Sequence, residues 1–406
     1  MPAIAKILIV FASMLVLSRV RVQLGLALVL GGIALNLWAG LPVVDTLTNL
    51  AAALSDGDVW LLMAITTLII ELGRFMTEKR NADEIIAATT RWGGRHGRAA
   101  SLMALPAVIG LIPMPGGALF SAPFVKQAAD KDGSTPEWMS SVNYWFRHVW
   151  EYWWPMYPGV IVAMAVFDMD ARAFVATQFF FSPVAVIAGY IFLIRPHVTR
   201  LMDHTAAEHV HSRRAWFVAI PLIITIASLF LVPPILRPFL PAGAQESTRM
   251  LSLLIGLILS VTVVYCDEVK QSGTALPRTM FSSLLKWKGL NVLVSLGGVL
   301  VFKVMLDASG LLPIASDDLV RSSVPIVVAV AALPFLAGLV TGIALGFAGT
   351  AFPLVVGLMV AEGGALTPMA TLVLAYGFGY MGMILSPVHL CLLVTKDYFG
   401  APMQKI

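Results

Sequence analysis

Long apolar stretches separated by short polar connections form the main pattern along this chain. A membrane-spanning helix needs about 20 mainly apolar residues, and many stretches reach or approach this length. The pattern predicts an all-α polytopic membrane protein with about nine crossings, two of them broken. The predicted crossings are Ile4–Leu17, Val22–Ala39, Val59–Phe75, Trp138–Phe167, Phe174–Ile194, Ala215–Val232, Met250–Tyr265, Asn291–Leu306 and Pro368–Tyr398.

Two further apolar segments, near residues 99–125 and 324–360, contain Gly and Pro clusters near their middles. We interpret them as re-entrant hairpins, which enter and leave the membrane on the same side. A half-helix that starts at a tip offers backbone amides to an anion, and a glycine lets a ligand approach the backbone. The alternative is that the glycines only allow close helix packing. The tip residues expected to bind substrate are Pro115, Gly116 and Gly117 in the first hairpin, and Ala348, Gly349 and Thr350 in the second.

Composition and charge support a location in a lipid bilayer. Hydrophobic residues make up 58% of the chain and charged residues 12%, too few for the surface of a soluble protein. A net charge of +4 requires no nucleic-acid partner, and two cysteines are too few for a disulfide framework or a metal cage. We therefore expect no metal and no cofactor. Basic residues gather in alternate loops, which predicts a bacterial-type inner membrane protein with its amino terminus outside and its carboxyl terminus cytoplasmic.

A shift of 232 positions (349 minus 117) aligns two parts of the chain without a gap. It places Gly117 on Gly349, the Thr-Pro pair at 135–136 on the pair at 367–368, and Pro155 on Pro387. The register predicts two inverted repeats, at residues 1–195 and 214–406, joined by a cytoplasmic linker at 196–213. Paired broken helices in inverted repeats indicate a binding site near the bilayer midplane.

Charged residues interrupt the fourth predicted crossing, in the block Asn143–Pro158. In a helix that begins near Pro136, Arg147 and His148 would lie roughly 16–18 Å along its axis, close to mid-membrane. Ionisable groups at this depth usually face a cavity or a partner, so they indicate a substrate or ion pathway. The nearby prolines are expected to break the helix.

These residues suggest two alternative roles. Arg147 could bind a substrate carboxylate, with Asn143 in the same substrate-binding set. Glu151 would share a helix face with both Arg147 and His148 and would orient His148. Either His148 or Glu151 could carry a coupling proton. The alternative interpretation is that Arg147 and Glu151 form an ion pair that only stiffens the helix bundle.

The second copy carries Gly379, Tyr380 and Met383 at the positions of the charged residues. The charge therefore belongs to the first copy. We expect the second copy to contribute backbone groups together with Ser386 and His389, which lie beside its break.

Three blocks, IPMPGGALFSAP, NYWFRHVWEYWWPMYP and GFAGTAFP, resemble the family called domain of unknown function 401. The resemblance covers essentially the whole chain and places it in the ion-transporter superfamily, with gluconate permeases, citrate and dicarboxylate transporters and arsenite pumps. It implies a homodimer in which the two hairpins and broken helices move as a transport domain against a scaffold, the elevator mechanism. Relatives in that superfamily take up small organic anions with Na⁺ or H⁺.

The sequence therefore predicts a secondary active transporter for a small anionic metabolite, coupled to Na⁺ or H⁺. A monovalent cation/proton antiporter remains an alternative, with Glu151 and His148 as its ligands. An intramembrane enzyme would need a nucleophile near the His148–Glu151 pair, and none is evident, so we expect no enzyme. A passive channel is the remaining alternative.

Overall fold

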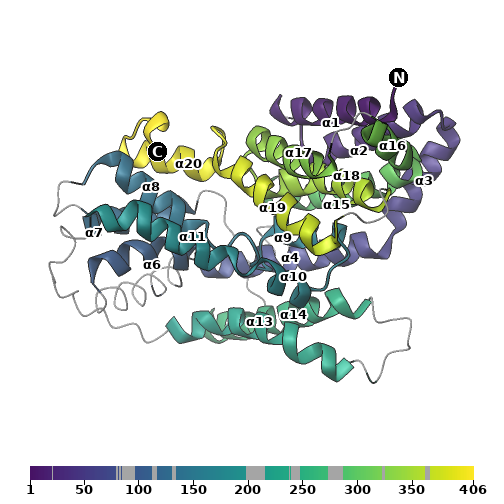
Figure 1. The fold of residues 1–406 in the computed structure, drawn as a ribbon. Coiled ribbons are helices and arrows are strands. Elements are labelled where there is room, and N and C mark those ends of the chain that lie inside the picture. The colour runs from purple at the N-terminus through teal and green to yellow at the C-terminus, as the bar shows by residue number, and fades with distance from the viewer. Residues whose placement is uncertain are drawn as a thin grey trace. The chain divides into compact units, whose positions relative to one another are not determined.

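The computed structural model is almost entirely helical (Figure 1). It describes residues 1–20, 22–78, 81, 84, 97–111, 117–129, 134–197, 215–236, 238, 247–272, 287–321, 325–361 and 366–406. These residues contain no β-strand, and five segments among them are long and apolar enough to cross a membrane. The prediction of an all-α polytopic membrane protein is confirmed.

Most predicted crossings and hairpins correspond to helices. The helices are α1 (Ala3–Arg19), α2 (Leu24–Ala39), α3 (Val43–Ser55), α4 (Gly57–Thr77), α6 (Arg98–Gly110), α7 (Ala118–Ala129), α8 (Pro136–Arg147), α9 (Pro158–Val166), α10 (Ala171–Gln178), α11 (Phe181–Gly189), α13 (Ala215–Leu236), α14 (Ser247–Ser272), α15 (Trp287–Ala308), α16 (Leu311–Arg321), α17 (Ile326–Thr341), α18 (Ala344–Ala361), α19 (Pro368–Ile384) and α20 (Leu390–Phe399). A π-helical segment, Tyr190–Ile194, and short 3₁₀ turns complete the described elements.

Helix α3 was not predicted from the sequence. It starts after Pro42, has no basic residue in its last turn, and buries only Thr46 and Ala53. Val43, Val44 and Leu47 are exposed. A helix with so few buried positions lacks the continuous apolar run by which we recognised the crossings.

The chain divides into two compact units. Unit 1 contains residues 1–67, 157–177 and 281–389, and unit 2 contains residues 68–156, 178–280 and 390–406. Each unit therefore takes residues from both predicted repeats. The division into repeats at 1–195 and 214–406 stays a prediction about sequence and topology.

In unit 1, glycines bring helices into direct backbone contact. A Cβ atom on Gly25 of α2 would overlap the backbone of α15 at Val294. A Cβ atom on Gly338 of α17 would overlap the carbonyl group of Gly379 in α19, and one on Gly382 would overlap that of Phe335. Small residues permit this close helix packing in membranes.

In unit 2, α6, α7, α8 and α20 pack against one another, and α13 packs against α14 (Figure 1). Helix α8 is therefore surrounded by the first hairpin and by a helix that lies more than 240 residues later in the sequence. This group of four helices holds the candidate site.

Both predicted breaks are present. Helix α8 ends at Arg147 and α9 begins at Pro158, and α19 ends at Ile384 and α20 begins at Leu390. The first interruption starts well before Pro155, so the prolines alone do not end α8. Pro158 is instead the first residue of α9, a position where its missing N–H costs no helical hydrogen bond.

Helix starts follow the 232-residue register. Thr135 and Thr367 are N-caps whose hydroxyl oxygens accept from Trp138 N–H at 3.3 Å and Ala370 N–H at 3.2 Å. In both cases proline occupies the first helical turn. The same local chemistry therefore starts α8 and α19.

Candidate functional site

The end of α8 and the turns after it hold the candidate site in unit 2. Arg147 is the last residue of α8, and His148 and Glu151 follow in consecutive turns. All three side chains are buried, with Arg147 and His148 only 1% exposed. The block thus places ionisable groups inside the protein, where a charge needs compensation.

The spacing of Glu151 suggested that it shares a helix face with Arg147 and His148, but the structure shows that it does not. Helix α8 has ended, and Glu151 N–H donates to the His148 carbonyl oxygen across a tight turn at 3.2 Å. This turn still brings Glu151 close to His148, and Oε1 lies 3.8 Å from His148 Nε2. The predicted pair therefore forms through a turn.

His148 also ends the helix. Its backbone N–H bonds to the Trp145 carbonyl at 3.2 Å, and its ring Nδ1 lies 2.6 Å from the Tyr144 carbonyl oxygen. A carbonyl can only accept, so Nδ1 carries the hydrogen and replaces the backbone bond that a continuing helix would make to Tyr144. Nε2 is then the ring nitrogen on the side of Glu151.

Arg147 lies at a close contact between α8 and α6. A Cβ atom on Gly110, the last residue of α6, would overlap the Arg147 carbonyl oxygen. A cation at a helix C-terminus is favoured by the helix dipole, which partly offsets the cost of burying the guanidinium. Gly110 is therefore needed to position Arg147.

Asn143 belongs to a polar network that joins three helices. Its Nδ2 donates to the Ala118 carbonyl at 2.9 Å and to Thr395 Oγ1 at 3.3 Å, and its Oδ1 accepts from Ser121 Oγ at 2.6 Å. Every one of these side chains is fully buried. The predicted substrate ligand thus ties α8 to α7 and α20, and binding a substrate there would require these bonds to be exchanged.

The tryptophans of the block anchor it to neighbouring helices. Sequence reasoning could not separate a pocket lining from a lipid-facing belt. None of the four tryptophan rings is exposed, and the indole N–H groups of three of them donate within unit 2, whereas Trp154 Nε1 is buried and has no hydrogen-bond partner among the described residues. The bonds run from Trp145 to the Ala185 carbonyl at 2.8 Å, from Trp150 to the Ala107 carbonyl at 2.8 Å, and from Trp153 to Ser182 Oγ at 2.7 Å.

The predicted position of the second hairpin tip is wrong. The turn between α17 and α18 lies at Gly342 and Ile343, so Gly346–Thr350 is inside α18. The amides of residues 348–350 therefore take part in the helix and are not presented to a ligand.

The glycines of this segment serve helix packing. A Cβ atom on Gly349 would overlap Val299 of α15, and one on Gly346 would overlap Thr341. The Thr350 hydroxyl donates to the Gly346 carbonyl at 2.7 Å. The packing alternative is the correct one for this part of the second hairpin.

At the first tip, Pro115 and Gly116 lie outside the described residues. Gly117 forms the turn before α7, and its carbonyl accepts from Phe120 N–H at 3.0 Å. The role of this tip stays a prediction.

Ser386 and His389 lie together beside the second break, in unit 1. Ser386 Oγ donates to the Leu339 carbonyl at 2.7 Å, and His389 N–H donates to the Ser386 carbonyl at 3.2 Å. Gly342 is in the left-handed conformation with φ of 66°, and a Cβ there would lie 2.9 Å from His389 N. The actual turn of the second hairpin therefore packs directly against the second break.

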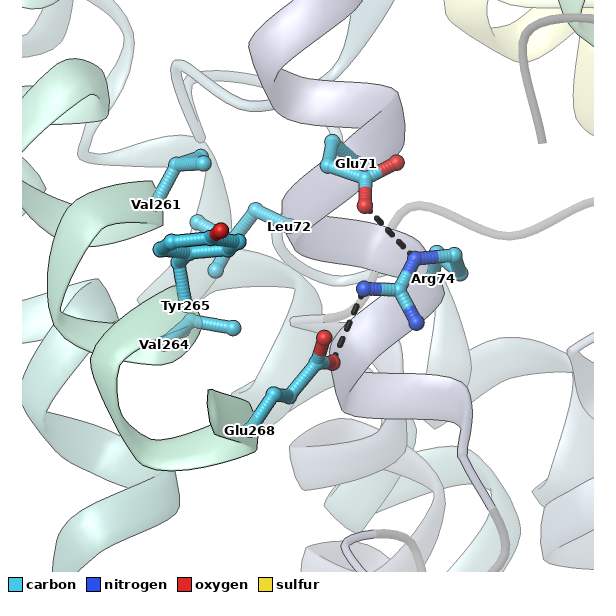
Figure 2. Close-up of a pocket in the computed structure, with 7 residues that line it drawn as sticks. All are labelled: Glu71, Leu72, Arg74, Val261, Val264, Tyr265 and Glu268. Carbon is cyan, nitrogen blue, oxygen red and sulfur yellow. Dashed lines mark hydrogen bonds and ion pairs between the residues drawn. The ribbon is translucent and has the colours of Figure 1, made fainter. Parts of the chain in front are cut away.

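A second charge cluster, which sequence reasoning missed, joins α4 and α14 in unit 2, with Glu71 buried and Arg74 and Glu268 partly buried. Figure 2 shows Arg74 between two carboxylates, with Nε 2.7 Å from Glu71 Oε1 and Nη2 2.8 Å from Glu268 Oε1. Val261, Val264 and Tyr265 line the rest of this small pocket. The spacing of Glu71 and Arg74 on one helix was a usable signal, but nothing in the sequence pointed to Glu268.

Comparison with protein-family models identifies the family of this chain. A search of curated proteins finds no match to this chain. A family model matches residues 3–406, which is essentially the whole chain. This polytopic helical membrane protein therefore belongs to the family described as protein of unknown function (DUF401).

Proposed function

We propose that this protein is a secondary active transporter for a small anionic metabolite, with organic carboxylates as the expected substrate class. The observation that carries the proposal is the burial of Arg147, His148 and Glu151 at the end of α8, where the predicted membrane crossing is interrupted. Burying such groups is costly, and in membrane proteins they usually mark substrate or ion pathways.

Arg147 would supply the anion contact. A guanidinium presents paired N–H groups that match both oxygens of a carboxylate, which a lysine ammonium cannot do. The C-terminal position of Arg147 in α8 places this group beside backbone freed by the break. Irregular backbone at membrane depth is tolerated where it is buried in protein or lines a cavity.

The two breaks support a moving mechanism. Of the five points at which the chain passes between units 1 and 2, two lie at the breaks, at residues 156–157 and 389–390. Hinges in moving domains are typically a few loop or element-terminal residues of this kind. We infer an elevator-type transporter of the ion-transporter superfamily, acting as a homodimer in a bacterial-type inner membrane with its amino terminus outside.

Coupling to H⁺ or Na⁺ would use the residues next to Arg147. His148 Nε2 and Glu151 Oε1 are 3.8 Å apart, so an imidazole and a carboxylate that could each carry the coupling proton lie close together. The test of coupling is uptake measured with imposed pH and Na⁺ gradients.

Uptake into proteoliposomes tests the proposal. A thermal-shift screen of purified protein against small organic and inorganic anions first identifies a ligand, since binding to the folded state raises its stability. Uptake of that ligand should saturate, depend on an ion gradient, and be lost in Arg147→Ala. The exposed Arg19→Gln serves as a control that removes one positive charge elsewhere.

If the Arg147→Ala variant takes up the ligand at the same rate as the wild-type protein, Arg147 is not the anion contact. Uptake that neither saturates nor responds to an ion gradient would indicate a channel. The His148–Glu151 geometry also favours a second candidate, a monovalent cation/proton antiporter. In that case Na⁺ or Li⁺ alone would stabilise the protein, and Arg147→Gln would keep cation/proton exchange that Glu151→Gln loses.

A further inference from the structure

Cys391, which sequence analysis set aside, lies close to His148 in unit 2. The ligand atoms of these two buried side chains are within 4.8 Å of each other. Glu151 Oε1 is 3.8 Å from His148 Nε2. We propose that His148, Glu151 and Cys391 form a binding site for a borderline-soft divalent metal ion such as Zn²⁺, and this proposal does not depend on the transport function.

An independent contact supports the approach of Cys391 to His148. Helices α8 and α20 pack together, and Asn143 Nδ2 lies 3.3 Å from Thr395 Oγ1. Cys391 precedes Thr395 by one helical turn, whereas His148 follows Asn143 by a little more than one turn. Two antiparallel helices in this register bring Cys391 to the end of α8, where the candidate site lies.

His148 has the orientation of a metal ligand. Histidines that bind metals usually donate their other ring N–H to a carbonyl or a carboxylate, which fixes the ring and its tautomer. Nδ1 of His148 makes this bond to the Tyr144 carbonyl at 2.6 Å. Nε2 then carries the lone pair of the neutral ring and points to the side of Glu151.

Distances and charges also fit the ion. Zn²⁺ binds nitrogen at about 2.0–2.1 Å and sulfur at about 2.3 Å, so the two ligand atoms need to be about 3.6 Å apart. The separation of up to 4.8 Å in the structure requires a shift of about 1.2 Å or less, within the reach of a side chain. One thiolate and one carboxylate neutralise the charge of the ion, which suits a buried site.

Binding would release a proton. The S–H bond of Cys391 breaks, its proton leaves to solvent, and the sulfur electron pair forms the bond to the metal. Metal affinity should therefore rise with pH. Glu151 and Tyr144 face His148, and Arg147, next to it in the chain, adds a positive charge that weakens binding relative to a site with a neutral neighbour.

Metal binding can be measured on the full-length protein, purified in detergent without a polyhistidine tag. Zn²⁺ binding is followed by equilibrium dialysis, and Co²⁺ binding by its absorption spectrum. We expect one ion per chain and a thiolate-to-Co²⁺ charge-transfer band. Cys391→Ser should remove the band and weaken binding by about 100-fold or more, whereas a lost partner of a ligand typically costs about 10–100-fold.

The only other cysteine supplies the matched control. Cys266 is exposed, so Cys266→Ser should keep the band and the affinity within about twofold. A band that survives in Cys391→Ser, or Zn²⁺ affinity that is unchanged in both Cys391→Ser and His148→Gln, would overturn the proposal.

A second measurement covers the case in which Cys391→Ser does not fold. In the Cys266→Ser protein, Cys391 is the single thiol, and Zn²⁺ should slow its alkylation at least about tenfold, because a metal-bound thiolate is withheld from the reagent. Mg²⁺ at the same concentration should have no effect, since it prefers oxygen ligands. Equal alkylation rates with and without Zn²⁺ would contradict the site.

Discussion

The two broken helices share their construction and differ in their chemistry. Helices α8 and α19 start at the same Thr-Pro signal, and a partner helix of the preceding hairpin approaches each of them at a glycine. At the end of α8 stand Arg147, His148 and Glu151, whereas the equivalent positions in α19 are Gly379, Tyr380 and Met383.

The two copies differ in backbone at the positions where they differ in charge. Helix α19 continues through these three positions to Ile384, with Tyr380 and Met383 buried. Helix α8 ends at Arg147, with the His148 ring bonded to its last turn. Because the second copy forms its break without charged residues at these positions, charge is not needed to interrupt the helix, and we propose a functional role for it in the first copy.

The largest expected effect is on uptake by Arg147→Ala. Truncating one partner of a buried charged contact costs about 2–5 kcal/mol, so uptake of the identified anion should fall at least about 30-fold. The matched control is Tyr380→Phe in the second copy, next to the position equivalent to Arg147, which should keep uptake within about threefold. Equal losses in both variants would show that the two copies do not differ in function.

The second-largest effects are expected at the positions where two helices are in close contact. Gly110→Val and Gly338→Val should each destabilise the folded protein by about 1–3 kcal/mol or more, because a side chain at either position overlaps a backbone carbonyl. Thermal unfolding in detergent measures this effect. Gly57→Ala is the control, since its Cβ meets no atom within 4 Å. A neutral Gly110→Val would contradict the tight contact at Arg147.

The polar anchors of the two copies should differ in strength. Asn143→Ala removes bonds to Ala118, Ser121 and Thr395 and should cost about 2–4 kcal/mol, since each buried group left unsatisfied costs about 1–3 kcal/mol. Ser386→Ala removes one donor from the Leu339 carbonyl and should cost about 1 kcal/mol. Chemical unfolding of both variants gives the ranking, and the reverse order would contradict the network.

The smallest change in stability is expected for Glu151→Gln. Glutamine has nearly the shape of glutamate, and the carboxylate at 3.8 Å is beyond hydrogen-bond distance from His148 Nε2, so we expect the free energy of unfolding to change by less than about 1 kcal/mol. Uptake by this variant should nevertheless lose its dependence on pH, if the pair carries the coupling proton. An unchanged pH profile would place the coupling ion elsewhere.

Local signals in the sequence were sufficient for much of the fold. The Thr-Pro pairs identified the starts of α8 and α19 because an N-cap hydroxyl and a proline act within one turn. The apolar runs located the long helices, because a helix that crosses a bilayer needs about 20 mainly apolar residues whether or not they are buried in the protein. Helix α3, with only Thr46 and Ala53 buried, gave no comparable run.

The errors came from residues whose role depends on distant contacts. Gly346 and Gly349 were expected at a turn, but they stand where Thr341 and Val299 leave no room for a side chain. Sequence alone cannot distinguish a glycine needed for conformation from one needed for space. The Arg74–Glu268 ion pair and the approach of Cys391 to His148 each join residues nearly 200 or more positions apart.

The packing of α20 against α8 has a consequence for biosynthesis. Residues 390–406 belong to unit 2, and Thr395 is one of the partners of Asn143. A ribosome that has completed α8 must therefore translate more than 240 further residues before this partner exists. Chains fold during synthesis from the amino terminus, so the nascent protein must hold α8 and the first hairpin in the membrane with an incomplete polar network until the last helix arrives.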